Sequence, residues 1–136
     1  MDVMLHRIPV SKAPKDAVLI TGTSSGIGLE TALHLANKGI IVFACVRKEV
    51  DAEALKKRGK AEIIPVMLDV TNANQLKAAV KQVESWLTAY DARLIGLINN
   101  AGYSEAAALE LVSKDTLQRQ FDGNHVSAGF VADFFL

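Results

Sequence analysis

The chain has 136 residues, the length of one compact domain. Half of its residues are hydrophobic, 22% are charged and the net charge is zero. This composition excludes the disordered and fibrous classes and gives no support for a nucleic-acid partner. No apolar stretch reaches the ~20 residues that a membrane-spanning helix needs. The single cysteine, Cys45, excludes an internal disulfide and fits a reducing compartment, so we expect a cytoplasmic location.

Residues 1–16 are expected to form a loose leader before one domain that spans residues 17–136. The leader contains Pro9 and Pro14 and lacks the continuous apolar core of a secretory signal peptide. Its sequence leaves open a role in targeting to an organelle.

Four short apolar runs without alternation predict strands buried on both faces, as in a parallel sheet, at residues 17–20, 40–45, 63–68 and 94–98. Helical spacing of apolar residues predicts helices between them, at residues 27–38, 51–58 and 72–88. Strands and helices therefore alternate along the chain. This order predicts an α/β fold with a doubly wound, Rossmann-like parallel sheet of about four strands and flanking helices.

A further helical pattern begins at Ser113 and continues to an apolar chain end, although termini are usually polar. We expect a helix cut in mid-course and a domain truncated at its C-terminus. The strand at residues 94–98 would then lie at a sheet edge. The last helix would expose Phe130, Phe134 and Phe135, so we expect the chain to fold poorly by itself.

The first predicted strand runs into TGTSSGIG, from Thr21 to Gly28. A glycine-rich turn that opens a helix binds phosphate, because the free N–H groups and the dipole of the helix favour an anion. No Gly-Lys-Ser/Thr follows, which argues against an NTPase. The glycines at positions 22, 26 and 28 instead suit a pyrophosphate turn, where they allow the turn, the close approach of the ligand and tight helix–strand packing.

The second predicted strand ends with Val46 and Arg47. In dinucleotide folds an acidic side chain at this tip binds the free 2′-hydroxyl of the adenosine ribose. Val46 replaces the acid here, and an arginine such as Arg47 can pair with a 2′-phosphate. We therefore expect NADP(H) as the preferred cofactor and NAD(H) as the alternative. The alternative interpretation, which we favour less, is an ordinary exposed arginine.

Asp69 and Val70 end the third predicted strand, and Asn99-Asn100-Ala101-Gly102 follows the fourth. Asp69 could accept a hydrogen bond from an adenine amino group, although alone it would by default be interpreted as a turn or helix-cap residue. Together with the glycine-rich turn, these segments resemble the short-chain dehydrogenase/reductase family over residues 17–136. The branch they resemble most acts on hydroxysteroids, retinoids and 3-hydroxybutyrate.

The resemblance implies a role for each matching residue. Asp69 and Val70 would border the adenine and Arg47 would hold the 2′-phosphate. Asn99, Ala101 and Gly102 belong to the segment that would line the adenosine side and steady the sheet. The pyrophosphate would lie on the glycine-rich turn, with the residues Gly22, Ser24, Ser25, Gly26, Ile27 and Gly28.

Asn124, in the last helical pattern, matches the family's catalytic asparagine, which holds a water in a proton relay. Gly123 departs from the apolar residue usual before it, which weakens the helix locally. The family also needs a serine on the next strand and a Tyr-x-x-x-Lys on the next helix. Tyr90 is followed four residues later by Leu94 and Tyr103 by Ala107, so neither provides that motif.

The resemblance implies an oxidoreductase that transfers a hydride between nicotinamide and a small-molecule carbonyl or secondary alcohol, represented here by its cofactor-binding half. A homo-oligomer is expected for the full-length protein, and the 136-residue chain alone is expected to be inactive. The alternative is a non-catalytic NADP(H)-binding fragment or degenerate family member. The three histidines lack the spacing of metal ligands, so no metal is expected.

Overall fold

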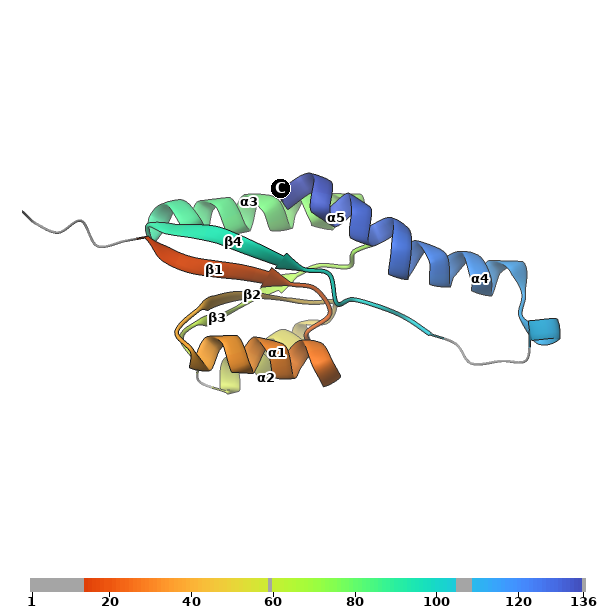
Figure 1. Cartoon of the computed structure of the whole chain (residues 1–136), viewed down its shortest axis with the longest axis horizontal. Coiled ribbons are helices and arrows are strands. Elements are labelled where there is room, and N and C mark those ends of the chain that lie inside the picture. The colour runs from red at the N-terminus through yellow and green to blue at the C-terminus, as the bar shows by residue number, and fades with distance from the viewer. Residues whose placement is uncertain (1–13, 59, 105–108, 136) are drawn as a thin grey trace, which may run out of the picture.

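The computed structural model of the protein describes residues 14–58, 60–104 and 109–135. Its centre is a parallel sheet with the strand order β3-β2-β1-β4 (Figure 1). Within these residues the strands are β1 (Lys15–Ile20), β2 (Ile41–Val46), β3 (Ile63–Met67) and β4 (Ala92–Ile98). The α/β class and the parallel sheet predicted from the sequence are therefore confirmed.

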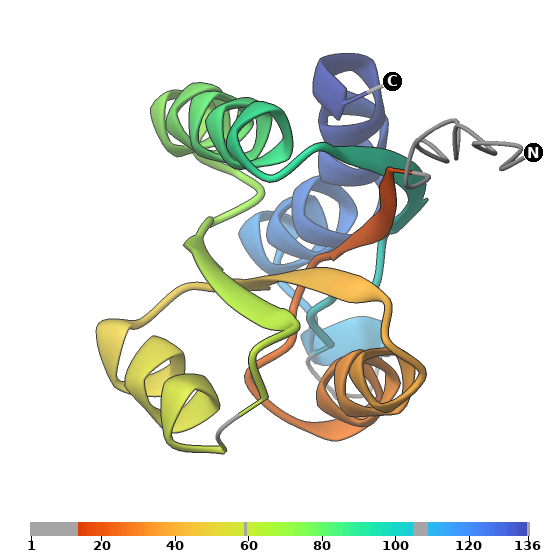
Figure 2. The ribbon, with the colours of Figure 1, turned by 90° about the vertical axis from the view of Figure 1, so that its left-hand side faces the viewer.

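Helices cover both faces of the sheet, as Figures 1 and 2 show. On one face lie α1 (Gly26–Asn37) and α2 (Glu49–Lys57), and on the other lie α3 (Ala73–Ala89) and α5 (Ser127–Phe135). Between β4 and α5 the chain forms the 3₁₀ turn η1 (Leu109–Leu111), α4 (Lys114–Phe121) and the π-helical turn η2 (Asp122–Val126).

Because helices pack on both faces of the sheet, both sides of each inner strand are buried, and the strand sequences are continuous apolar runs. In β1, Ala17 and Leu19 pack toward α3, whereas Val18 and Ile20 pack toward α1 and α2. Every residue of β2 is buried, including Cys45. Burial raises the pKa of the Cys45 thiol to about 12, which keeps the thiol protonated. Cys45 is therefore a core residue, as its apolar neighbours indicated.

Local sequence signals set some of the helix boundaries. The side chain of Asn72 caps α3 by accepting hydrogen bonds from the N–H groups of Asn74 and Gln75. Gly39, with a φ of 80°, ends α1 in the left-handed conformation that glycine adopts without strain. β1 begins at Lys15, two residues earlier than expected, so Lys15 and Asp16 belong to the sheet rather than to a leader. The remainder of the expected leader, residues 1–13, lies outside the described residues.

The last helical segment extends along the sheet and beyond it, with α4 lying away from the strands (Figure 1). Its π-helical turn falls at Gly123, where the N–H of Ser127 donates to the carbonyl of Asp122, five residues earlier. Glycine disfavours the regular α-helix, and wide turns of this kind occur often at functional sites. Among the described residues, no helix is both long and apolar enough to cross a membrane.

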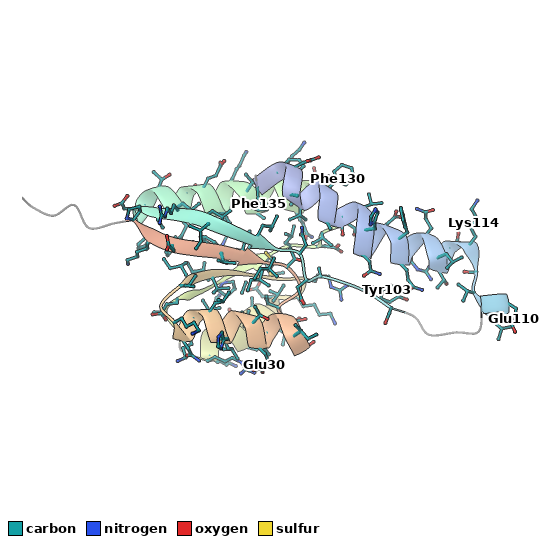
Figure 3. The ribbon with its side chains drawn as sticks, viewed as in Figure 1. Glu30, Tyr103, Glu110, Lys114, Phe130 and Phe135 are labelled. Carbon is teal, nitrogen blue, oxygen red and sulfur yellow. The ribbon has the colours of Figure 1, made fainter. Side chains whose placement is uncertain are left out.

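The apolar surface expected at β4 and α5 is present. β4 pairs with β1 on one side only, and Ile95 on it is 52% exposed. Phe130 lies on the outer side of α5 and is 56% exposed (Figure 3). Phe135 differs from the expectation, because its ring is half-buried against the core cluster that includes α3.

We predict that the edge of β4 drives self-association of the 136-residue chain. Ile95→Lys places a charge on this edge and should lower the associated fraction measured by analytical ultracentrifugation. Ala78→Lys, on an exposed position of α3, adds the same charge elsewhere and should leave the fraction unchanged. A wild-type chain that is monomeric and melts in one sharp transition would contradict the prediction.

Candidate functional site

A cleft of about 780 Å³ opens at the carboxyl ends of the strands, where ligands bind in open α/β sheets. It brings together the glycine-rich turn after β1, the tips of β2 and β3, the segment after β4 and the start of the π-helical turn. Its lining contains nearly every residue expected to bind the cofactor: Gly22, Ser24, Ser25, Ile27, Gly28, Arg47, Asp69, Val70, Ala101 and Gly102.

The glycine-rich turn has the conformation that its glycines allow. Gly22 and Gly26 have φ values of 69° and 59°, a region that other residues rarely adopt. A Cβ on Gly22 would also lie 2.7 Å from the Cα of Ala101. Side chains at these positions would therefore strain the turn, and at Gly22 would push it away from the segment after β4.

Gly28 allows the first turn of α1 to lie close to that same segment. A Cβ on Gly28 would collide with the side-chain amide of Asn100 and with the carbonyl of Gly22. This is the close-packing role expected of the third glycine.

The cleft is closed at its base by hydrogen bonds between Thr21 and Asn100. The hydroxyl of Thr21 accepts from the N–H groups of Asn100 and Ala101 at 3.0 and 2.9 Å. In return, the side-chain amide of Asn100 donates to the carbonyls of Thr21 and Gly22 at 3.1 and 2.9 Å. These bonds join the ends of β1 and β4, so the steadying role expected of the Asn-Asn-Ala-Gly segment falls to Asn100.

The helix start at α1 is suited to an anion. Ser25 occupies the N-cap position, but its side chain makes no capping hydrogen bond, and no acidic residue lies in the first turn. The N–H groups of the first turn and the positive end of the helix dipole therefore lie at the cleft with no acidic side chain in that turn.

The tips of β2 and β3 place a cation beside a carboxylate. The side-chain hydroxyl of Thr71 donates to Asp69 Oδ1 at 2.6 Å, and the Thr71 N–H donates to the same oxygen at 2.9 Å. These hydrogen bonds, the hydroxyl's most of all, hold the pKa of the Asp69 carboxyl below its usual value of 3.8. The positive charge of Arg47 lowers the pKa further, while partial burial opposes the shift. Asp69 is therefore an ionised acceptor throughout the neutral range.

Three expected site residues lie outside this lining. Gly26 serves the turn through its backbone conformation, and Asn99 turns away, with its amide donating to the carbonyl of Ala128 at 3.3 Å. The Asn124 amide donates to the Tyr103 carbonyl at 2.6 Å, and Asn124 Oδ1 accepts from the Tyr103 N–H at 2.7 Å. Asn124 thus fastens the segment after β4 to the π-helical turn. Figure 3 shows Tyr103 on this segment, between the sheet and α4.

Several lining residues were not singled out from the sequence as cofactor ligands, among them Asn100, Tyr103, Arg119, Asp122 and Gly123. Arg119 and Asp122 reach the cleft because the last helical segment continues beyond the carboxyl ends of the strands (Figure 1). The sequence also did not predict the structural role of Thr23. It is fully buried, and its side-chain hydroxyl donates to the carbonyl of Cys45 at 3.0 Å.

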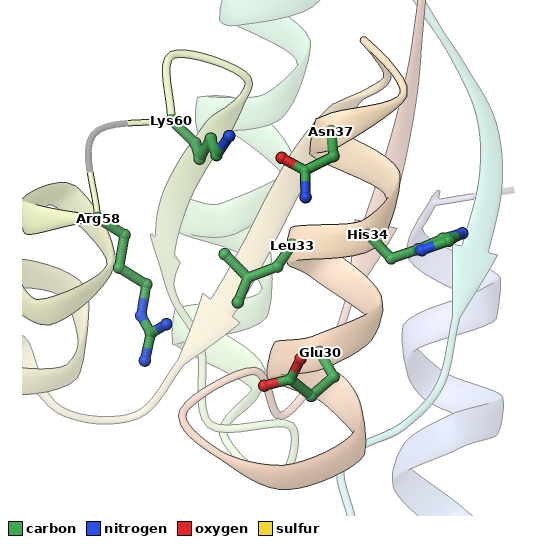
Figure 4. Close-up of a pocket in the computed structure, with 6 residues that line it drawn as sticks. All are labelled: Glu30, Leu33, His34, Asn37, Arg58 and Lys60. Carbon is green, nitrogen blue, oxygen red and sulfur yellow. The ribbon is translucent and has the colours of Figure 1, made fainter.

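A second hollow lies between α1 and the end of α2, lined by the side chains that Figure 4 shows: Glu30, Leu33, His34, Asn37, Arg58 and Lys60. This hollow shares no lining residue with the cleft at the carboxyl ends of the strands. Within the part of the chain that the structure describes, no cluster of three or more histidine, cysteine, aspartate or glutamate side chains could hold a metal ion.

The sequence model described as short chain dehydrogenase matches residues 16–136, nearly the whole chain. The chain belongs to the short-chain dehydrogenase family. Two relatives and one solved structure illustrate the similarity. The oxidoreductase YbbO of Escherichia coli K12, whose activity is not characterised, is 35% identical over 92% of this chain and 45% of its own length.

The mitochondrial D-beta-hydroxybutyrate dehydrogenase of Mus musculus is 33% identical over 79% of this chain and 33% of its own length. The crystal structure of an NADPH-bound carbonyl reductase from chicken fatty liver superimposes with a TM-score of 0.79 and 29% identity. That match covers 91% of this chain and 48% of the reductase. This short-chain dehydrogenase chain therefore spans less than half the length of each of the three proteins.

We predict that Gly28→Ala destabilises the chain by about 1–3 kcal/mol, because the added methyl overpacks the contact with Asn100. Gly129→Ala is the matched control, since it lies in α5 with no atom near its added Cβ. It should stabilise the helix by roughly 0.5–1 kcal/mol. Urea denaturation measures both, and equal effects of the two substitutions would disprove the packing role of Gly28.

Asp69 is predicted to stabilise the fold at neutral pH and to lose this contribution in acid. Its folded-state pKa is lowered, so the contribution is complete above the unfolded pKa of about 4 and disappears as the pH falls through the lower folded value. Asp69→Asn should therefore be less stable than wild type at pH 7 and equal to it in strong acid.

Thr71→Val removes the main cause of the lowered pKa and should show the same pH profile as Asp69→Asn. Urea denaturation of the three proteins as a function of pH measures the effect. A stability difference that grows as the pH falls would contradict it.

Proposed function

We propose that the chain is the cofactor-binding part of an NADP(H)-dependent oxidoreductase that moves a hydride between nicotinamide and a carbonyl or secondary alcohol. The observation that carries the proposal is the cleft, in which a pyrophosphate turn lies beside Arg47 at the tip of β2. Val46 precedes Arg47 and stands where an acid would bind a free 2′-hydroxyl, which favours a 2′-phosphate at this tip.

Different residues of the cleft would bind different parts of the dinucleotide. The α1 N-terminus, with the backbone of Ser24 and Ser25, would hold the pyrophosphate, and Arg47 would pair with the 2′-phosphate. Asp69, ionised and with one oxygen held by Thr71, would accept from the adenine amino group beside Val70. Bound NADPH would supply the hydride. The NADPH-bound carbonyl reductase, similar over 91% of this chain, supports this choice of cofactor over NAD(H).

Asn124 is the residue we propose for the proton relay. Its amide uses one Oδ1 lone pair and one Nδ2 hydrogen on the Tyr103 backbone. A primary amide has a second lone pair and a second hydrogen, which could hold a water. Asn124 also leaves no room for a side chain at position 102, because a Cβ on Gly102 would lie 2.9 Å from Asn124 Oδ1.

A second candidate is an NADP(H)-binding module without catalysis. It is favoured by the lack of a Tyr-x-x-x-Lys in these 136 residues. The two candidates differ in turnover. A chain that binds NADPH but oxidises none in the presence of small carbonyl compounds supports the module for this polypeptide, and oxidation of NADPH would contradict it.

We further propose a homo-oligomer for the full-length protein and a cytoplasmic location. The exposed apolar residues Leu117, Phe121 and Phe130 on α4 and α5 support the first. The buried, protonated thiol of Cys45 is compatible with the second.

Arg47→Asp is the decisive test of cofactor choice. The substitution places a negative charge against the 2′-phosphate, so NADPH affinity should fall at least tenfold while NADH affinity stays the same or rises. Lys77→Asp, on an exposed position of α3 outside the cleft lining, changes the net charge equally and should leave the preference intact. Calorimetric titration measures both affinities, and an unchanged ratio for Arg47→Asp would refute the assignment.

A further inference from the structure

Thr23 connects the glycine-rich turn to the strand that carries Arg47. Its backbone N–H and its side-chain hydroxyl both donate to the carbonyl oxygen of Cys45, each at 3.0 Å. Thr23 and Cys45 are completely buried, and Arg47 follows Cys45 by two residues. One residue of the turn thus uses both lone pairs of one strand carbonyl.

The same strand end is bonded to the next strand. The N–H of Leu68 donates to the carbonyl of Val46 at 2.9 Å, and Asp69 follows directly. Hydrogen bonds to two successive carbonyls of β2, those of Cys45 and Val46, therefore attach the turn on one side and β3 on the other. The three groups proposed to bind the pyrophosphate, the 2′-phosphate and the adenine belong to one connected frame.

A dinucleotide requires such a frame, because its pyrophosphate and its 2′-phosphate are joined by one ribose of fixed size. When the pyrophosphate lies on the glycine-rich turn, the 2′-phosphate reaches Arg47 only if the turn and Arg47 have the right separation. Preorganisation of this kind raises affinity by lowering the cost of ordering the site, and small displacements weaken it strongly. NADH lacks the 2′-phosphate and does not impose this second constraint.

We propose that Thr23 is a positioning residue that sets the pyrophosphate turn at a fixed distance from Arg47, and that its hydroxyl thereby contributes to selection of NADPH over NADH. The inference rests on the proposed function, since it needs Arg47 to bind a 2′-phosphate. A purely local role, in which the hydroxyl only satisfies a buried carbonyl, would weaken both cofactors equally.

The test compares NADPH and NADH affinities of the 136-residue chain by calorimetric titration. Thr23→Val keeps the shape of the side chain but removes the hydroxyl. It should lower NADPH affinity roughly fivefold more than NADH affinity, in keeping with the loss of one net hydrogen bond. Thr23→Ser keeps the hydroxyl and should preserve the wild-type preference. Circular dichroism checks the fold, and Thr23→Ala, which also lacks the hydroxyl, replaces Thr23→Val if the latter does not fold.

A double-mutant cycle supplies the second readout. In an Arg47→Ala background, the extra effect of Thr23→Val on NADPH should disappear, because there is no longer an arginine to position. Equal losses for the two cofactors, or additive effects in the cycle, would overturn the inference while leaving the proposed function intact. A wild-type chain that binds NADPH no better than NADH would overturn both.

Discussion

The reciprocal hydrogen bonds between Thr21 and Asn100 are the constraint on which the candidate site depends. Thr21 and Asn100 are 79 residues apart in the sequence, and they meet because β1 and β4 are parallel and adjacent. Thr21 offers one oxygen to two backbone N–H groups, while the Asn100 amide satisfies two carbonyls of the turn. Because all these groups are buried or half-buried, losing one partner would leave the others unsatisfied, which is costly in a protein interior.

The glycines of the turn follow from this constraint. With the turn fixed to Asn100 and Ala101, no room is left for side chains on Gly22 and Gly28. The same segment continues to Gly102 and Tyr103, where Asn124 fastens it to the π-helical turn. The cleft and the last helical segment are therefore connected by hydrogen bonds, and the wide turn at Gly123 lies next to this connection.

The described fold also leaves apolar surface uncovered. β4 has a free edge, and α4 and α5 carry exposed Leu117, Phe121 and Phe130. The chain spans less than half the length of YbbO, of the mouse dehydrogenase and of the chicken carbonyl reductase. The residues that line the cleft lie between Gly22, after β1, and Gly123, in the turn that follows α4.

The sequence by itself determined the α/β class, the four strands and the place of the glycine-rich turn between β1 and α1. These depend on local properties: continuous apolar runs, helical spacing, glycine conformations and an asparagine cap. The motifs also indicated most of the cleft lining, since carboxyl ends of parallel strands meet at one edge of a sheet. Boundaries were less exact. β1 begins at Lys15, because backbone pairing with β4 continues beyond the apolar residues.

Only the tertiary structure decided how individual side chains in a motif divide their roles. Asn99 and Asn100 are adjacent in sequence, but one turns toward α5 and the other toward the glycine-rich turn. The contact of Asn124 with Tyr103, the place of Arg119 in the cleft and the bond of Thr23 to Cys45 likewise join segments far apart in the chain. No local pattern encodes such contacts, because they arise from the packing of helices and turns around the finished sheet.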